Sequence, residues 1–217
     1  MALPALFALA FGTGFTGAVA PGPVLFATVR WSARRGRWVG PAVTLGHMIV
    51  ELPLVVGVVL GLGGLLKADL FVAVVGLAGG TTLLAMGVSM AWTARRASLP
   101  SNADDDPDGG RIELGRIAAA GALTSLSNPY FPLWWATVGL SFLAQAAPAG
   151  PAGYAVFYTG HVLADLVWYS AVSESMHRGR RLLSDRGYRR LVGACGLLMA
   201  AFGVFFAVRG YGFLGGT

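Results

Sequence analysis

Six long apolar runs dominate the sequence and limit what it can fold into. Each has about the 20 residues that a helix needs to cross roughly 30 Å of hydrocarbon. Lipid offers the backbone no hydrogen bonds, and the runs lack the alternation of barrel strands, so we expect helices. The sequence predicts an all-α membrane protein with six transmembrane helices. The runs are Leu3–Val29, Trp38–Leu66, Leu70–Trp92, Ile117–Leu143, Tyr154–Met176 and Leu191–Phe213.

The composition agrees with a membrane protein and argues against several other classes. Hydrophobic residues make up 55% of the 217 residues and charged residues only 12%, which is unusual for a soluble protein. The net charge of +6 is gathered in short links, without the interleaved basic and aromatic face of a nucleic-acid-binding surface. The single cysteine, Cys195, cannot form an internal disulfide. We therefore expect no nucleic-acid partner and no enzyme activity.

The basic residues predict how the chain crosses the membrane. Fourteen of the 16 lysines and arginines fall in three links, at 30–37, 95–116 and 178–190. Only Lys67 and Arg209 lie toward the other face. Links rich in Lys and Arg stay in the cytoplasm. The sequence therefore predicts a multi-pass membrane protein with these three links in the cytoplasm and both termini extracytoplasmic.

The third link divides the chain into two halves. Around Asp104, Asp105, Asp106 and Asp108 it is rich in Pro and Gly, a composition typical of a flexible, solvated linker rather than a cation-sensing segment. We expect a first three-helix repeat at 1–97, an acidic cytoplasmic linker at 98–115 and a second three-helix repeat at 116–217. Three helices per half make the second half enter from the opposite face, which predicts a 3+3 inverted repeat.

The second and fifth apolar runs share the motif G-H-x-x-x-[E/D]-L, at 46–52 and 160–166. It places His47 one helical turn before Glu51, and His161 one turn before Asp165. Ionisable groups at membrane depth are costly and are usually kept for a function. A lone buried histidine is more often structural, but the repetition of the pair favours one functional site built from both halves.

The first and fourth apolar runs share an interruption. Ala20-Pro21-Gly22-Pro23 breaks the first and Ser127-Asn128-Pro129 breaks the fourth, because proline removes a backbone donor and clashes with the preceding turn. Asn128 before Pro129 is typical of a helix restart. Broken helices at matching mid-membrane positions mark a transporter's substrate site, and their free N–H groups suit a carboxylate.

Two weaker patterns concern helix packing. The pairs Gly57 with Gly61 and Gly76 with Gly80 fit G-x-x-x-G, which predicts close helix contacts and would permit a homodimer. A group of aromatic residues is better interpreted as core packing or interface anchoring than as the lining of a pathway. These aromatic residues are Trp134, Trp135, Trp168 and Tyr169.

With these motifs together, the chain resembles the LysE/RhtB family of amino-acid exporters over nearly its whole length. The resemblance implies a six-helix inner-membrane exporter of amino acids or related small metabolites, energised by the proton gradient and without a cofactor. Tyr130 departs from the family pattern, in which a lysine often follows Asn-Pro. The resemblance is carried by Ala20-Pro21-Gly22-Pro23, Arg34-Arg35-Gly36, Ser127-Asn128-Pro129 and Gly160 to Asp165.

Two functions follow from these residues. In the leading hypothesis the segments Pro21-Gly22-Pro23 and Asn128-Pro129 bind the carboxylate of an amino acid. Glu51 and Asp165 then bind its amino group or exchange the coupling proton, with His47 and His161 beside them. The alternative is export of a divalent metal cation, with the same two histidines and two carboxylates as ligands.

Overall fold

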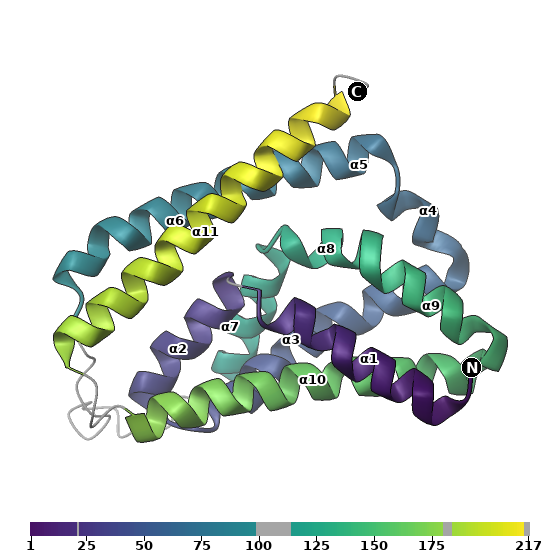
Figure 1. The fold of residues 1–217 in the computed structure, drawn as a ribbon, viewed down its shortest axis with the longest axis horizontal. Coiled ribbons are helices and arrows are strands. Elements are labelled where there is room, and N and C mark those ends of the chain that lie inside the picture. Colours follow the sequence, from purple (N-terminus) through teal and green to yellow (C-terminus); the bar gives the residue numbers. More distant parts are fainter. Residues whose placement is uncertain (21, 99–113, 180–183, 215–217) are drawn as a thin grey trace.

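The structure is a computed structural model in which residues 1–20, 22–98, 114–179 and 184–214 are described. Pro21 and the predicted acidic stretch at 104–108 lie outside the described residues. The described residues form helices and contain no strand (Figure 1). The helical elements are α1 (Leu3–Ala18), α2 (Pro23–Arg35), α3 (Val39–Gly57), η1 (Val58–Leu62), α4 (Gly63–Leu66), α5 (Asp69–Val74), η2 (Val75–Gly79), α6 (Gly80–Thr93), η3 (Ala94–Arg96), α7 (Leu114–Leu126), α8 (Tyr130–Trp134), η5 (Trp135–Gly139), α9 (Leu140–Ala146), η6 (Ala147–Ala149), α10 (Gly150–Gly179) and α11 (Asp185–Leu214).

Three helical runs among the described residues are long and apolar enough to cross a membrane: Val39–Leu66, Asp69–Arg96 and Asp185–Phe213. A fourth is added if α1 and α2, bent by 78°, are counted as one span. The α7 helix and the run from α8 to α9 are each short of about 20 residues, because a break divides them. The chain is thus an all-α membrane protein, and the six-span arrangement stays a prediction.

The most extensive helix contacts join the two halves of the sequence. Helix α1 packs along α10, α3 packs along α7, and α6 packs along α11 (Figure 1). In each pair one helix precedes the linker and the other follows it. The amino terminus, the α4–α5 turn and the last turns of α11 lie at one end of the molecule, whereas α6 and α10 finish at the other (Figure 1).

Glycines set the closest approach in two of these pairs. A Cβ on Gly46 of α3 would overlap the backbone carbonyl of Ala118 in α7. A Cβ on Gly160 of α10 would lie 2.9 Å from the backbone oxygen of Phe7 in α1. Both glycines come directly before the histidine of the repeated motif. The motif therefore brings each histidine against the helix that leads into a break.

Helices α6 and α11 are joined along a stripe of glycines spaced by seven residues, a spacing that keeps one face toward the partner. The stripe comprises Gly80 and Gly87 on α6 and Gly196, Gly203 and Gly210 on α11. A Cβ on Gly87 would lie 2.6 Å from the backbone oxygen of Gly196, and one on Gly203 would lie 2.7 Å from that of Gly80.

The two predicted G-x-x-x-G pairs have different outcomes. Gly76 and Gly80 both contact α11, which confirms the predicted close helix contact. Because α11 of the same chain covers these two glycines, they are not free to form a dimer contact. The prediction for Gly57 and Gly61 is wrong. Gly61 has φ 108° and no atom within 4 Å of its Cβ position, so it interrupts the helix instead of packing against another one.

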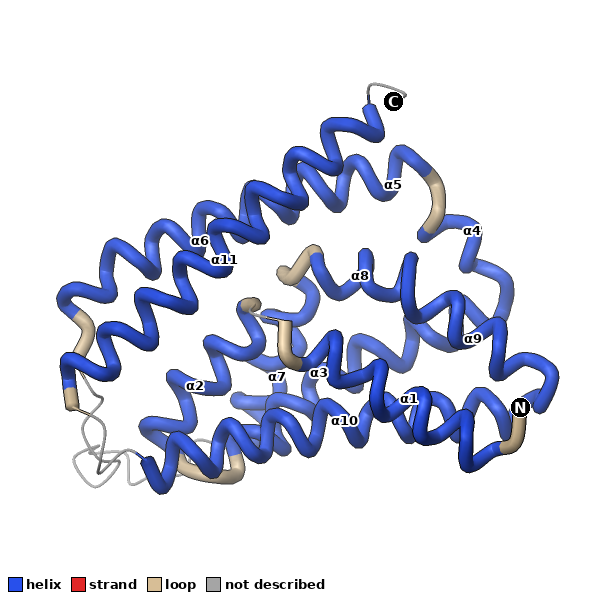
Figure 2. The backbone as a smooth tube through the Cα atoms, in the orientation of Figure 1, coloured by secondary structure: helices blue, strands red, loops and turns tan. Residues whose placement is uncertain are grey.

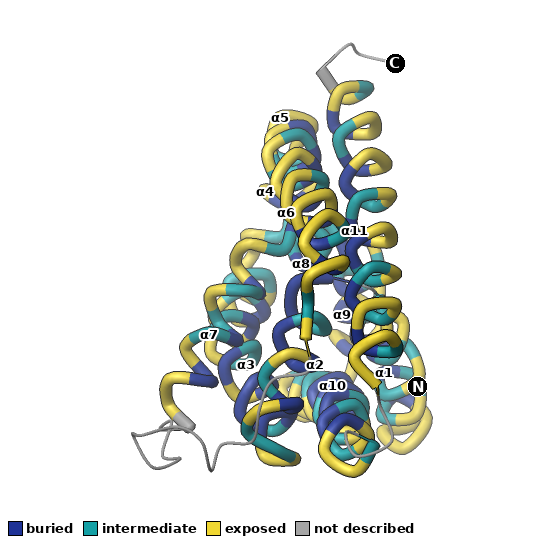
Figure 3. The backbone as a smooth tube through the Cα atoms, turned by 90° about the vertical axis from the view of Figure 1, so that its left-hand side faces the viewer, coloured by how far each residue is buried: buried dark blue, intermediate teal, exposed yellow. Residues whose placement is uncertain are grey.

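Burial is arranged as expected for a protein in lipid. Large apolar side chains point outward, such as Leu60 and Trp92, which are 78% and 81% exposed. Polar and charged groups, among them Glu51, His161 and Asp165, are buried between the helices. In Figure 3 the dark-blue buried positions face the middle of the bundle and the yellow exposed positions face outward. The ionisable residues of the repeated motif are thus inside the protein.

Candidate functional site

The two predicted helix breaks face each other. Helix α1 ends at Ala18 and α2 begins at Pro23, while α7 ends at Leu126 and α8 begins at Tyr130; both interruptions are drawn as loop in Figure 2. A Cβ on Gly22 of the first break would lie 3.4 Å from Nδ2 of Asn128 in the second. The two interruptions therefore adjoin one site.

Asn128 and Pro129 organise the restart of the second broken helix. The backbone N–H of Tyr130 donates to Oδ1 of Asn128 at 3.2 Å, so Asn128 satisfies the first free amide of the new helix. The helix begins one residue later than predicted, at Tyr130, with Pro129 in the N-cap position. Pro129 packs directly on Gly79 of η2, where any side chain would collide with its ring. Pro23 is fully buried in the first turn of α2. The restart is therefore fixed both by a cap and by packing.

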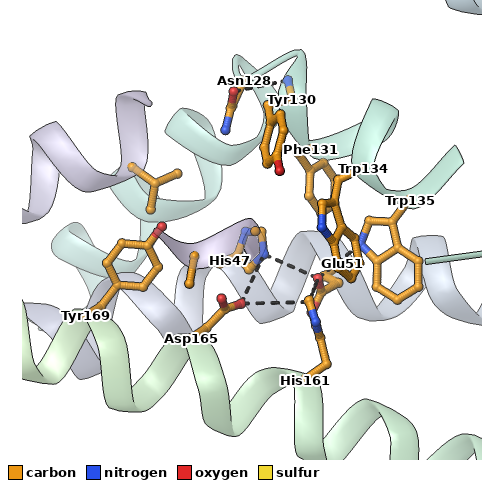
Figure 4. Close-up of a pocket in the computed structure, with 13 residues that line it drawn as sticks. His47, Glu51, Asn128, Tyr130, Phe131, Trp134, Trp135, His161, Asp165 and Tyr169 are labelled. Atoms are coloured by element: carbon orange, nitrogen blue, oxygen red, sulfur yellow. Dashed lines mark hydrogen bonds and ion pairs between the residues drawn. The ribbon is translucent and has the colours of Figure 1, made fainter. Parts of the chain in front are cut away.

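The four ionisable side chains of the repeated motif converge below these breaks (Figure 4). The Nε2 atom of His161 lies 2.9 Å from Oε1 of Glu51, and Nε2 of His47 lies 3.3 Å from the same oxygen. Oδ2 of Asp165 is 3.5 Å from Nε2 of His47 and 4.0 Å from Nε2 of His161. Two carboxylates thus share two imidazoles, and the contacts His47–Asp165 and His161–Glu51 link α3 to α10.

A serine fixes the orientation of His47. The hydroxyl of Ser125 donates to the backbone oxygen of Gly121 at 2.8 Å, so its one proton is used. The same hydroxyl oxygen lies 2.8 Å from Nδ1 of His47, and it can accept a hydrogen bond from that nitrogen in the tautomer that carries the proton on Nδ1. The Nε2 atom is left facing Glu51 and Asp165. There it can share an additional proton with the carboxylates or offer its lone pair to a cation.

The second histidine lacks such a partner. His161 reaches Glu51, which also accepts a hydrogen bond from Nε1 of Trp135 at 3.1 Å. Nδ1 of His161 is buried and has no hydrogen-bond partner among the described residues. It faces Gly14 of α1, where a Cβ would lie only 3.1 Å away. Where α7 presents Ser125 to His47, α1 presents a bare glycine to His161, so the two half-sites are not equivalent.

The cluster borders a small central cavity of about 40 Å³, which has room for about three water molecules. Of the predicted site residues, five line it; Gly22, Pro23 and Pro129 lie in the adjoining breaks, and Pro21 lies outside the described residues. The five predicted lining residues are His47, Glu51, Asn128, His161 and Asp165.

Aromatic side chains form much of the remaining wall. Phe131, Trp134, Trp135 and Tyr169 line the cavity, so three of the four aromatic residues singled out in the sequence belong to the site as well as to the packing. Ser125 and Phe131 carry no such signal in the sequence. A serine three residues before the predicted cap is too common a feature to indicate a histidine's partner.

The same four side chains have the geometry of a cation site. One ligand atom from each lies within 4.8 Å of all the others. Four tetrahedral ligands about 2.0–2.2 Å from a zinc ion are roughly 3.3–3.6 Å apart. The four histidine–carboxylate separations, from 2.9 to 4.0 Å, bracket that range, and the other ligand atoms lie within 4.8 Å of one another. Ser125 would be the outer partner of a ligating His47.

Comparison with known proteins gives a match over most of the chain. The sequence profile of the family described as LysE type translocator matches residues 15–210. No solved structure matches the chain.

Two relatives are similar over most of their length. One is "Putative amino acid efflux protein YcgF" of Bacillus subtilis (strain 168), 26% identical over 190 residues, which cover 87% of this chain and 88% of the relative. Another is "Chemotactic transduction protein ChpE" of Pseudomonas aeruginosa PAO1, 31% identical over 200 residues, which cover 90% of this chain and 94% of the relative.

Proposed function

Because this chain belongs to the LysE type translocator family, we propose that it is a secondary-active exporter of amino acids or related small metabolites, driven by the proton gradient. The name of the Bacillus subtilis relative, an amino acid efflux protein, supports this substrate class. The observation that carries the proposal is the buried cluster of Glu51, Asp165, His47 and His161 beside two helix breaks. Ionisable groups inside a membrane protein mark transport pathways and proton relays.

The helix pairing supports a 3+3 inverted repeat. If the second half repeats the first, the pair α1–α10 corresponds to the pair α7–α3, and the pair α6–α11 corresponds to itself. These are the three pairs with the most extensive contacts between the halves. Binding sites of transporters built in this way lie where the two repeats meet. The cluster fits this rule, since α3 and α10 each supply one histidine and one carboxylate.

The site offers groups for both ends of an amino acid. The backbone amides of Val24 and Leu25, in the first turn of α2, have no acceptor within the helix and suit a carboxylate. Glu51 and Asp165 suit the ammonium group or the coupling proton. The central cavity is smaller than an amino acid, so substrate binding requires the two breaks and the aromatic wall to separate.

Neutralising the acids tests the proposal. We expect Glu51→Gln and Asp165→Asn each to lower amino-acid efflux from preloaded cells at least tenfold while the protein still inserts into the membrane. Glu174→Gln is the matched control, because Glu174 only pairs with Arg178 on the surface of α10. Wild-type efflux by the Glu51→Gln, Asp165→Asn double variant would falsify this mechanism.

A second candidate is export of a divalent metal cation, favoured by the ligand geometry of the cluster and the small volume of the cavity. Metal analysis of the purified protein distinguishes the two functions. For the metal function we expect stoichiometric metal that is lost in His47→Ala and His161→Ala but kept in His177→Ala, since His177 lies at the far end of α10. If the unmodified protein and the three histidine variants all contain the same substoichiometric amount of metal, the metal function is contradicted and amino-acid export is retained.

A further inference from the structure

A second, much larger cavity lies beside the central one. It has a volume of about 540 Å³, within the range of small-molecule sites. Its walls come from the α4–α5 turn, from α8 and η5, and from the last turns of α11. The α4–α5 turn and the last turns of α11 lie at the end of the molecule that holds the amino terminus, and α8 lies nearer its middle (Figure 1). The positive-inside rule predicts that this end faces the exterior.

The two cavities share a wall. Tyr130 and Trp134 line both of them. Their polar ends are held by one residue of α1: the hydroxyl of Tyr130 donates to the backbone oxygen of Thr16, and Nε1 of Trp134 donates to its hydroxyl, both at 3.3 Å. Within the described part of the chain, these are the two residues that line both cavities. A molecule leaving the central site in this direction would have to displace them.

The larger cavity is apolar with two positive charges. Its walls include Leu133, Phe205, Phe206 and Phe213, and among the described residues its charged lining residues are Lys67 and Arg209. Neither of these forms an ion pair with another described residue. A cation next to an apolar wall is stabilised by an anion. The lining therefore suits a molecule with a negative group and a sizeable apolar body.

Resting on the proposed export function, we propose that this cavity is a second substrate site on the way out, and that it takes amino acids with large apolar side chains. The carboxylate faces Lys67 and Arg209, and the side chain lies against the phenylalanines of α11. Tyr130 and Trp134 form the partition between this site and the central cluster. Because this cavity shares the wall of Tyr130 and Trp134 with the central site, we take the transported molecule, and not a lipid, as its occupant.

Thiol labelling tests the site directly. The chain has one cysteine, so Cys195→Ser gives a cysteine-free background. Thr137→Cys places a thiol on the cavity wall. Thr81→Cys is the matched control: it is also an exposed helical threonine bonded to the carbonyl four residues earlier, but it lies outside the lining. In proteoliposomes, we expect a membrane-impermeant thiol reagent to modify Thr137→Cys at least tenfold faster.

Substrate protection identifies the occupant. We expect leucine or phenylalanine to slow labelling of Thr137→Cys severalfold and glycine to have no effect, in vesicles of zwitterionic lipid alone. Equal labelling of both thiols, or labelling that no amino acid slows, overturns the proposal. Protection that follows added anionic lipid instead of the amino acid assigns the cavity to a lipid and overturns it as well.

Charge removal gives an independent readout. We expect Lys67→Gln with Arg209→Gln to raise the KM for leucine efflux about tenfold without the loss of transport seen in Asp165→Asn. Arg95→Gln, at the opposite end of the bundle, is the control. If the Lys67→Gln, Arg209→Gln variant exports leucine with an unchanged KM, the second substrate site is contradicted and the export function is not. If the protein exports no amino acid but amino acids still protect Thr137→Cys from labelling, the export function is contradicted and the cavity is a ligand-binding site without a role in export.

Discussion

At the scale of single residues, the site depends on how His47 is held. Ser125 accepts from one ring nitrogen, and Glu51 and Asp165 lie beside the other. With Nδ1 hydrogen-bonded to the serine, Nε2 points at the two acids. Trp135 has a similar effect on Glu51, since its indole N–H holds Oε1 toward the histidines. These two neighbours keep the proton-exchanging atoms in place.

Removing the serine hydroxyl tests this orientation. We expect Ser125→Ala to lower the initial efflux rate about fivefold, because a lost hydrogen bond of about 1 kcal/mol leaves the imidazole free to rotate. Ser127→Ala is the control, since Ser127 is exposed and bonds only to the backbone of Leu123. Equal rates for the two variants would show that the serine does not position the histidine.

The sequence predicted the four ionisable residues but not their partners. Two histidine–acid pairs at the same spacing could be recognised as one site because both lie in corresponding apolar runs. Ser125 and Trp135 come from other helices, and their contacts depend on which helices pack together. The spacing of residues along the chain does not indicate which helices pack together. The orientation of His47 and the contact of Glu51 with Trp135 therefore required the structure.

At the scale of helices, glycine determines which pairs form. In lipid, helices gain little from burying apolar side chains, so close backbone approach becomes decisive. The seven-residue spacing of glycine along α6 and α11 gives one continuous contact. Gly46, before His47, brings α3 close to α7, and Gly160, before His161, brings α10 close to α1. The repeated motif thus combines a packing residue and a functional residue at adjacent positions.

Adding a methyl group to this contact should separate α6 from α11. We expect Gly203→Ala to destabilise the protein by about 1–3 kcal/mol, the usual effect of overpacking, because the new Cβ would lie 2.7 Å from the backbone oxygen of Gly80. Thermal unfolding in detergent measures it. Gly212→Ala, with open space at its Cβ position, should keep the Tm of the original chain; a matching decrease there would contradict the explanation.

Helix positions followed well from the apolar runs, and helix ends less well. The Pro-Gly-Pro and Asn-Pro breaks were predicted because proline acts locally on the backbone. The interruption at Gly61 was not predicted, because the G-x-x-x-G pattern was interpreted as a helix contact and the sequence alone does not show that Gly61 has a positive φ. Helix α10 also runs from Gly150 to Gly179, beyond the predicted Tyr154–Met176. It gains an uncharged turn at 150–153 and a polar turn with His177 and Arg178 at its other end.

At the scale of the whole molecule, charge separates the two ends of the bundle. Lys67 and Arg209 line the cavity at one end. Arg95 and Arg96 after α6, and Arg178 near the end of α10, lie at the other, where both helices finish (Figure 1). This distribution is the basis of the predicted orientation, with the larger cavity opening outward.

Cysteine labelling in cells checks the orientation. In the Cys195→Ser background, we expect Ala68→Cys, at the α4–α5 turn, to react with an impermeant reagent in intact cells. Ser98→Cys, directly after η3, should react only after the membrane is permeabilised, because links rich in arginine remain in the cytoplasm. The reverse labelling pattern would show that the predicted orientation is wrong and that the larger cavity faces the cytoplasm.

The pairing of α1 with α10, α3 with α7 and α6 with α11 means that neither half of the sequence contains the main partner of its own helices. A chain severed between Ser98 and Leu114 would therefore yield two fragments that each expose glycine-lined faces to lipid. Made separately, they should be degraded; made together, they should find each other and recover export, because every strong helix contact would form across the cut.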